Sequence, residues 1–214
     1  MPIDPRRGMK LSPKVRPLNR ALAVALVGLC GLRADLEAQE RSIFDTGDQL
    51  WVVGDVRVPA VADTFVLVRV QRYSQLSLGV GLVYEGPLDQ SLQLTIYIYP
   101  PPTGVVNAVV FEFESAVRDV RAYARQRSEM TVVVKKEEPY TLSTGSGLTL
   151  DGMFAEAEYT QSGSTRRSLV YVFEKEGFIL KYRVTHDSDA PPELQDHLDA
   201  WLRATAEQIQ RYPR

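Results

Sequence analysis

Residues 92–124 read LQLTIYIYPPPTGVVNAVVFEFESAVRDVRAYA, and two hydrophobic periods meet within them. Leucine and isoleucine occupy every second position from 92 to 98, which predicts a β-strand with one buried face. The prolines at 100–102 end this strand, because proline cannot donate to a sheet ladder. From about 107 to 128 apolar residues recur every three or four positions, which predicts an amphipathic helix.

Short runs rich in β-branched and aromatic residues surround this stretch on both sides. Successive strands are expected between residues 50 and 99, with a turn at Gly86-Pro87. After the helix, four more strands are expected, at 131–136, 150–160, 167–174 and 177–185. The last two are expected to form a hairpin, in which Gly177 can adopt the positive φ of a bulged turn.

A second helix is predicted near the end of the chain. The sequence DAPPE (189–193) is typical of a helix start, with Asp189 as the candidate cap and a proline in the first turn. An apolar stripe then follows at Leu194, Leu198, Trp201 and Ile209. The order of strands, helix, strands, helix favours an α+β fold in which two main helices cover an antiparallel β-sheet. A parallel doubly wound sheet would need helices between most of its strands.

This order of elements resembles the Mog1/PsbP-like α/β/α sandwich, and in particular exported bacterial members of that group. The residues that carry the resemblance are the strand at 92–99 with its prolines, the long helix, the strand FILKYRVT (178–185) and the C-terminal helix. The resemblance implies a sandwich fold and a binding or assembly role rather than catalysis. It brings no chemical motif, so it assigns no functional residue.

The first forty residues follow the pattern of a secretory signal peptide. Basic residues extend to Arg20, an apolar run covers 21–32, and Ala38 offers a cleavage point. The run of twelve residues is shorter than the roughly 20 that a membrane-spanning helix needs. We therefore expect a signal peptide at 1–38, a linker at 39–49, a single sandwich domain at 50–210 and no transmembrane helix in the mature chain. Two alternatives stay open: translation from Met9 instead of Met1, and lipidation of Cys30.

Charge and cysteine content narrow the partners and the compartment. Residues 1–38 hold seven of the 25 basic and three of the 27 acidic side chains, so residues 39–214 carry 18 and 24, a net charge of about −6. This acidity argues against nucleic acid as a partner. Cys30 is the one cysteine in the sequence, so the mature chain after Ala38 has no disulfide and no thiolate metal site. We expect a periplasmic or secreted protein of the bacterial envelope.

The sequence contains one concentration of metal-capable or acid/base side chains. His186 and Asp187 precede the C-terminal helix, and His197 lies on it. Two imidazoles with a neighbouring carboxylate could bind a divalent ion or shuttle a proton. The competing interpretation is that these groups are solvated or structural, because the spacing of the histidines matches no short metal motif.

Tyrosines on the predicted strands form a second candidate site. A buried tyrosine ring needs a partner for its hydroxyl, so rings lining a cleft would give an apolar pocket with polar tips. The competing interpretation places the same rings in the core. The possible ligand-facing residues are Tyr97, Tyr99, Tyr171 and Tyr182.

No stretch carries a recognisable catalytic or cofactor motif. The segment TGSG (144–147) lacks the GxSxG pattern, and GVG (79–81) lacks the third glycine of a dinucleotide fingerprint. The leading hypothesis is therefore an exported, non-catalytic binding or assembly module without a cofactor, whose partner is a protein or a small apolar ligand. The alternatives are a hydrolase or metal-dependent enzyme centred on residues 186–197, and an envelope lipoprotein anchored through Cys30.

Overall fold

The computed structural model describes residues 44–45, 50–53, 56–73, 79–88, 91–127 and 129–211, all within one compact unit that extends from Ala34 to Arg214. The elements before the first long helix are β1 (Phe44–Asp45), β2 (Leu50–Val53), β3 (Val56–Pro59), β4 (Val61–Ala62), β5 (Phe65–Arg72), β6 (Val80–Glu85) and β7 (Gln93–Tyr99). The others are α2 (Ala108–Arg125), β8 (Met130–Ser143), β9 (Thr149–Gln161), β10 (Ser164–Lys175), β11 (Phe178–Asp187), α3 (Glu193–Gln208) and β12 (Gln210–Arg211).

The main sheet has eight strands in the order β4-β5-β6-β7-β11-β10-β9-β8, and every neighbouring pair in it is antiparallel. Strands β4 to β7 form one half of this sheet and strands β8 to β11 the other, and within each half strands that are consecutive in the sequence are paired. The pairing of β7 with β11 joins the two halves. A smaller sheet has the order β1-β2-β3-β12. The prediction of an antiparallel sheet with two main helices, an α+β fold, is therefore confirmed.

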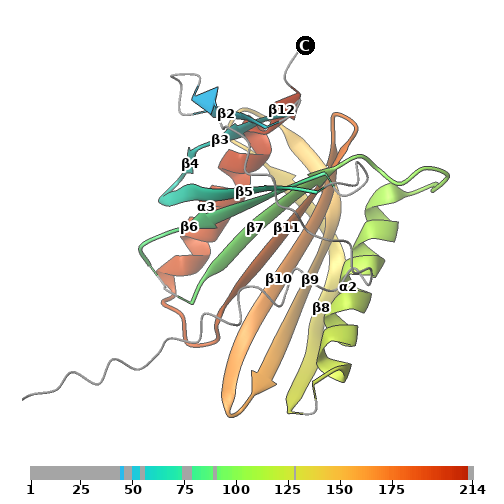
Figure 1. Ribbon diagram of the computed structural model, residues 1–214, viewed down its shortest axis with the longest axis vertical. Coiled ribbons are helices and arrows are strands. Elements are labelled where there is room, and N and C mark those ends of the chain that lie inside the picture. Colours follow the sequence, from blue (N-terminus) through green and yellow to red (C-terminus); the bar gives the residue numbers. More distant parts are fainter. Residues whose placement is uncertain are drawn as a thin grey trace, which may run out of the picture. The chain divides into compact units, whose positions relative to one another are not determined.

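The two helices cover opposite faces of the main sheet at opposite ends (Figure 1). Helix α2 packs against β8, β9 and β10, and its apolar stripe forms one core with Val170, Val172 and Ile179. Helix α3 belongs to the second core, together with Leu180 and Tyr182. Since Ile179 and Leu180 are successive residues of one strand, their side chains point to opposite faces. Among the described residues, each helix covers only part of its face of the sheet.

The helix starts differ in how well the sequence predicted them. Helix α2 begins after Asn107, whose side chain accepts a hydrogen bond from the Val110 amide at 3.0 Å, as expected for an N-cap. The cap predicted for the second helix at Asp189 is wrong. Helix α3 begins at Glu193, and Pro192 occupies the cap position without a side-chain hydrogen bond. The residue before a proline avoids the helical conformation, so two consecutive prolines delay the start beyond the reach of Asp189.

The predicted hairpin joins β10 to β11, but its turn has two residues. Glu176 and Gly177 have φ of 51° and 74°, the pair of positive values found in a type I′ turn. Strand β8 is longer than the predicted 131–136 and reaches Ser143. It is an edge strand with a register shift between Val134 and Lys136 and a proline at position 139.

Of the features predicted for the amino-terminal 49 residues, only part of the linker lies among the described residues. Strand β1 lies within residues 39–49, where the sequence predicts a linker, and it pairs with β2. The signal peptide at 1–38, Met9, Cys30 and Ala38 lie outside the described residues.

Candidate functional site

One half of the α2 face has no covering helix in the described part of the chain. We call this surface the open half-face; it is the α2 side of β5, β6, β7 and β11. Helix α2 packs over β8 to β10, whereas Val66 and Val68 on β5 are each 48% exposed. They are neighbours of Leu67, which is buried in the opposite core. The alternation along β5 therefore places Val66 and Val68 on the open half-face, and the register shift between Leu67 and Arg69 brings Arg69 to the same face.

The strand register aligns one row of side chains across the open half-face. Arg69 pairs with Val83, Val83 with Thr95, and Thr95 with Arg183. Two arginines thus flank two smaller side chains. Neighbouring strands are about 4.8 Å apart, so the backbones of the two arginines are separated by about 14 Å.

Arg183 is held near the boundary with α2. Its Nη2 donates to the Tyr159 hydroxyl at 3.5 Å. Its Nε is buried and has no hydrogen-bond partner among the described residues. A buried donor without a partner has a desolvation cost, and structures commonly satisfy such groups with water or a ligand.

A second row runs beside the first. Gln71 pairs with Gly81, Gly81 with Tyr97, and Tyr97 with Lys181. The Lys181 ammonium lies 5.3 Å from the centre of the Tyr97 ring and 5.1 Å from that of Tyr99. These distances are within the range of cation–π attraction. Two of the four candidate tyrosines therefore contact one cation at the edge of the open half-face.

Two carboxylates of α2 border this row. Glu112 Oε2 accepts a hydrogen bond from the Tyr99 hydroxyl at 2.7 Å. Asp119 lies near Lys181 and Arg183, and burial raises the pKa of its carboxyl although both cations oppose the shift. Burial disfavours the ionised form of a carboxyl, and here it outweighs the attraction.

The other two candidate tyrosines lie on the opposite face. Tyr182 is fully buried, and its ring centre is 5.6 Å from that of Trp201. Tyr171 is buried against Phe154, with ring centres 4.8 Å apart. Burial raises the pKa of both hydroxyls. The four tyrosines therefore form no common ligand surface. Tyr97 and Tyr99 lie on the α2 face of the sheet, whereas Tyr171 and Tyr182 lie on the opposite face.

Each of the two candidate histidines has its own hydrogen-bond partner. His186 is buried, and its Nδ1 donates to the Asp187 carbonyl oxygen at 2.8 Å. The Asp187 carboxylate pairs with Arg166 Nε at 3.1 Å. His197 Nδ1 donates to Asp63 Oδ2 at 2.6 Å. Among the described residues, no three side chains of histidine, cysteine, aspartate or glutamate gather as metal ligands would.

The pair of Asp63 and His197 connects the turn between β4 and β5 to α3. Burial of the Asp63 carboxyl opposes its ionisation, but hydrogen bonds from His197 and Thr64 outweigh burial and hold the pKa of Asp63 below its usual value. Asp63 has φ of 54°, a value that asparagine also tolerates. Asp63→Asn therefore removes the charge without straining the turn.

We expect Asp63→Asn to lower the free energy of unfolding at pH 7 by less than about 1 kcal/mol, because solvent screens this partly exposed pair. Because the pKa of Asp63 is lower in the folded state than its unfolded value of 3.8, the ionised carboxylate stabilises the folded protein at pH values above 3.8. This stabilisation is lost as the pH falls below 3.8 and through the folded-state pKa. Urea denaturation at pH 7 and at pH 3 should show that the difference between the two proteins shrinks in acid. A difference that grew in acid would contradict this assignment.

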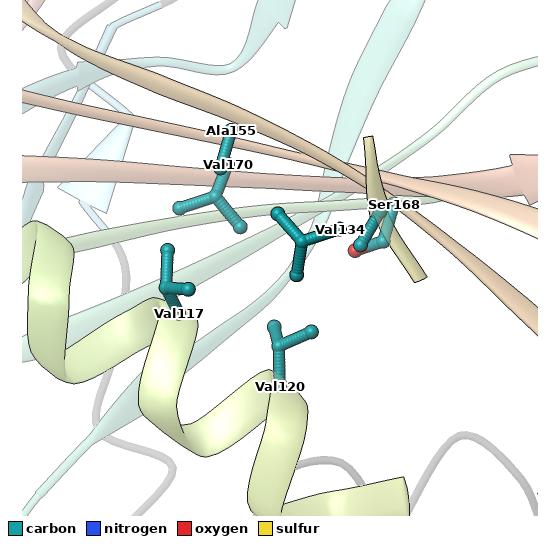
Figure 2. Close-up of a pocket in the computed structure, with 7 residues that line it drawn as sticks. Val117, Val120, Val134, Ala155, Ser168 and Val170 are labelled. Carbon is teal, nitrogen blue, oxygen red and sulfur yellow. The ribbon is translucent and has the colours of Figure 1, made fainter. Parts of the chain in front are cut away.

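A small cavity lies between α2 and the sheet (Figure 2). Val117 and Val120 approach it from the helix, and Val134, Ala155, Ser168 and Val170 from the strands. Its volume is about 10 Å³, close to the minimum for one water molecule. This cavity has no room for a small apolar ligand, and the tyrosine candidates do not line it.

None of the helices in the described ranges combines the length and the apolar character that a membrane span requires. This finding concerns 44–45, 50–53, 56–73, 79–88, 91–127 and 129–211 only.

The sequence interpretation missed the cations of the open half-face. Arg69 lies between two valines on β5, whereas Lys181 and Arg183 flank Tyr182 on β11, so strand alternation already places these two on one face. Only the pairing of β5 with β6, of β6 with β7 and of β7 with β11 brings Arg69 into the row of Arg183. Basic residues within otherwise apolar strands were the available signal.

The comparisons with known proteins concern the arrangement of elements. No protein-family model matches the sequence, and no curated protein sequence matches it. The solved structures similar to this one include cyanobacterial PsbP (CyanoP) from Synechocystis sp. PCC 6803, at 13% identity and a TM-score of 0.45, with 86% of this chain and 97% of that chain covered. They also include LpqN, involved in cell envelope biogenesis of Mycobacterium tuberculosis, at 18% identity and a TM-score of 0.40, with 80% and 90% covered. A PsbP structure is thus among the proteins this chain is similar to, as the resemblance from its element order predicted.

Proposed function

We propose that this protein is an exported, non-catalytic binding or assembly module of the bacterial envelope, and that the open half-face is its docking surface. The observation that carries the proposal is the pair Val66 and Val68, each 48% exposed beside Arg69 on a strand of the main sheet. Exposed branched apolar side chains that lie next to a cation are typical of surfaces that another molecule covers.

The rigidity of the surface supports a docking role. Its side chains come from four hydrogen-bonded strands, with one register shift between Leu67 and Arg69, so the surface needs little ordering when a partner binds. A preorganised surface loses less conformational entropy on association. The choice of a protein over a small apolar ligand follows from the shape, since flat strand surfaces offer little enclosure for a small molecule.

Export and envelope location belong to the same proposal. They are supported by the order of basic residues, apolar run and Ala38 at the start of the sequence. Intact-mass measurement of the protein recovered from its own host tests export. A chain beginning at Gln39 would support the proposal, and an unprocessed chain in the cytosol would contradict it.

Site-specific crosslinking tests the docking surface. A photoreactive benzophenone amino acid is placed at position 68 of the full chain, and the matched control carries it at position 133. Val133 is also a strand valine and is 53% exposed, but it lies on the edge strand β8. We expect a discrete covalent adduct with a second protein from position 68 and none from position 133. No adduct at position 68, or equal adducts at both, would refute the open half-face as the docking surface.

A further inference from the structure

We infer that the partner of the open half-face is an acidic segment of a protein, which lies across β5, β6, β7 and β11 with its carboxylates toward Arg69 and Arg183. This inference rests on the proposed function and adds the chemical class of the partner.

The charge of the open half-face is opposite to that of the chain as a whole. Its two rows hold the cations Arg69, Lys181 and Arg183 and no acidic residue. Residues 39–214 carry a net charge of about −6, so three cations in adjacent rows stand out. The acidic residues of this surface lie outside the two rows: Glu85 pairs with Val66, Asp187 on β11 forms an ion pair with Arg166, and Asp119 approaches from α2.

The geometry of the first row suits carboxylates that are several residues apart. Arg69 and Arg183 stand at its two ends, and the smaller Val83 and Thr95 lie between them. The separation of about 14 Å corresponds to four or five residues of an extended chain at about 3.3 Å per residue. The Arg183 guanidinium contacts Tyr159 on β9, on the side of β11 away from Arg69, so one small anion does not contact both arginines in this arrangement, whereas a polypeptide with two spaced carboxylates can. Arginine also binds carboxylates in a bidentate manner, which lysine does not.

The apolar residues at one end favour a polypeptide over other anions. Val66 and Val68 adjoin Arg69 and can contact an apolar side chain of the same segment. Nucleic acid would be repelled by the remainder of this acidic chain.

A peptide titration tests the inference. The probe is the synthetic peptide acetyl-EVELDVE-amide, and the comparison peptide replaces each Glu by Gln and the Asp by Asn. Backbone amide shifts of the ¹⁵N-labelled full chain are recorded at low and at high salt. We expect the acidic peptide to shift amides of β5, β6, β7 and β11, the neutral peptide to bind at least about fivefold more weakly, and 0.5 M salt to reduce the difference.

Two charge reversals serve as the matched pair of variants. Arg69→Glu should weaken binding of the acidic peptide by at least about fivefold, since an attraction becomes a repulsion. Arg203→Glu makes the same change on α3, where Arg203 faces Asp199 at 3.8 Å, and should leave binding unchanged. Arg69 is exposed, so its reversal should also leave folding intact, which the amide spectrum itself checks.

The outcomes separate this inference from the proposed function. Equal binding of both peptides, shifts confined to other strands, or no binding of the acidic peptide would overturn the acidic class. If position 68 still gave its adduct, and Arg69→Glu did not reduce the adduct yield, the binding module would stand with a partner of different chemistry. Loss of the adduct in Arg69→Glu, but not in Arg203→Glu, would support both.

Discussion

Trp201→Ala should lower the free energy of unfolding by about 3–5 kcal/mol, the range found when a buried large aromatic is truncated. Trp201 is fully buried at the centre of an aromatic cluster. The ring centres of Phe65, Tyr84 and Tyr182 lie 6.3, 5.7 and 5.6 Å from that of Trp201, all in edge-on orientations. The substitution would therefore remove packing against three strands at once. The free energy of unfolding of natural domains is about 5–15 kcal/mol, so the variant should be close to the limit of stable folding.

Urea denaturation followed by circular dichroism measures this effect, with Phe111→Ala as the control. Phe111 is on α2 and is 46% exposed, so its truncation should cost less than about 1 kcal/mol. Trp201→Phe should cost less than Trp201→Ala, because it leaves a smaller cavity. It also removes an indole Nε1 that is buried without a hydrogen-bond partner in the described residues. A loss for Trp201→Ala no larger than that of the control would show that α3 does not depend on this cluster.

We expect Lys175→Ala to cost about 2–4 kcal/mol, because it leaves several buried carbonyl oxygens without a donor. The Lys175 ammonium donates to the carbonyl oxygens of Ala206, Glu207 and Ile209, at 2.7, 3.1 and 2.6 Å. These oxygens lie at the end of α3, where a helix has no internal donors left and its dipole favours a cation. Burial lowers the pKa of Lys175 although Glu176 and Glu207 oppose the shift, so desolvation offsets part of the gain.

Lys175→Met separates the hydrogen bonds from the packing of the aliphatic stem, since it keeps the stem and removes the donor. It should retain most of the loss seen for Lys175→Ala. Lys136→Met is the control, because Lys136 is on the surface, where its ammonium pairs with Glu138 at 2.7 Å and lies 5.8 Å from the centre of the Phe154 ring. The local readout is hydrogen exchange of the Arg211 amide, which donates to Glu176 Oε2 at 3.0 Å. Unchanged exchange at Arg211 together with unchanged stability would contradict the capping role.

The sequence predicted best the elements whose apolar residues recur with one clear period. Strand β7 and helix α2 each have one buried face, and Asn107 marks the helix start with its own side chain. Strand β8 was predicted too short because it is an edge strand. The charged residues at 135–138 are mostly exposed, so they interrupt the apolar pattern without ending the strand.

The positions of the candidate site residues depended on strand pairing and on contacts between segments that are distant in the sequence. Tyr97 and Tyr182 look alike in their own strands, but Tyr97 pairs with Lys181, so Tyr182 falls on the other face. The partner of His197 is Asp63, which is 134 residues away in the sequence. Lys175 lies in a predicted hairpin turn, where a charged side chain is ordinarily solvated, yet the end of α3 covers it. Register and long-range packing decided each of these positions.

The placement of α3 has a consequence for the order in which the protein can fold during synthesis. Strands β8 to β11 follow one another in the chain and receive α2, which is made just before them. Strands β4 to β7 are made before α2, but Trp201, which fills the core against β5 and β6, appears close to the end of synthesis. The earliest strands therefore keep an apolar face uncovered until nearly the whole chain exists. The amino-terminal half of this protein cannot complete its folding before its carboxyl-terminal end is available.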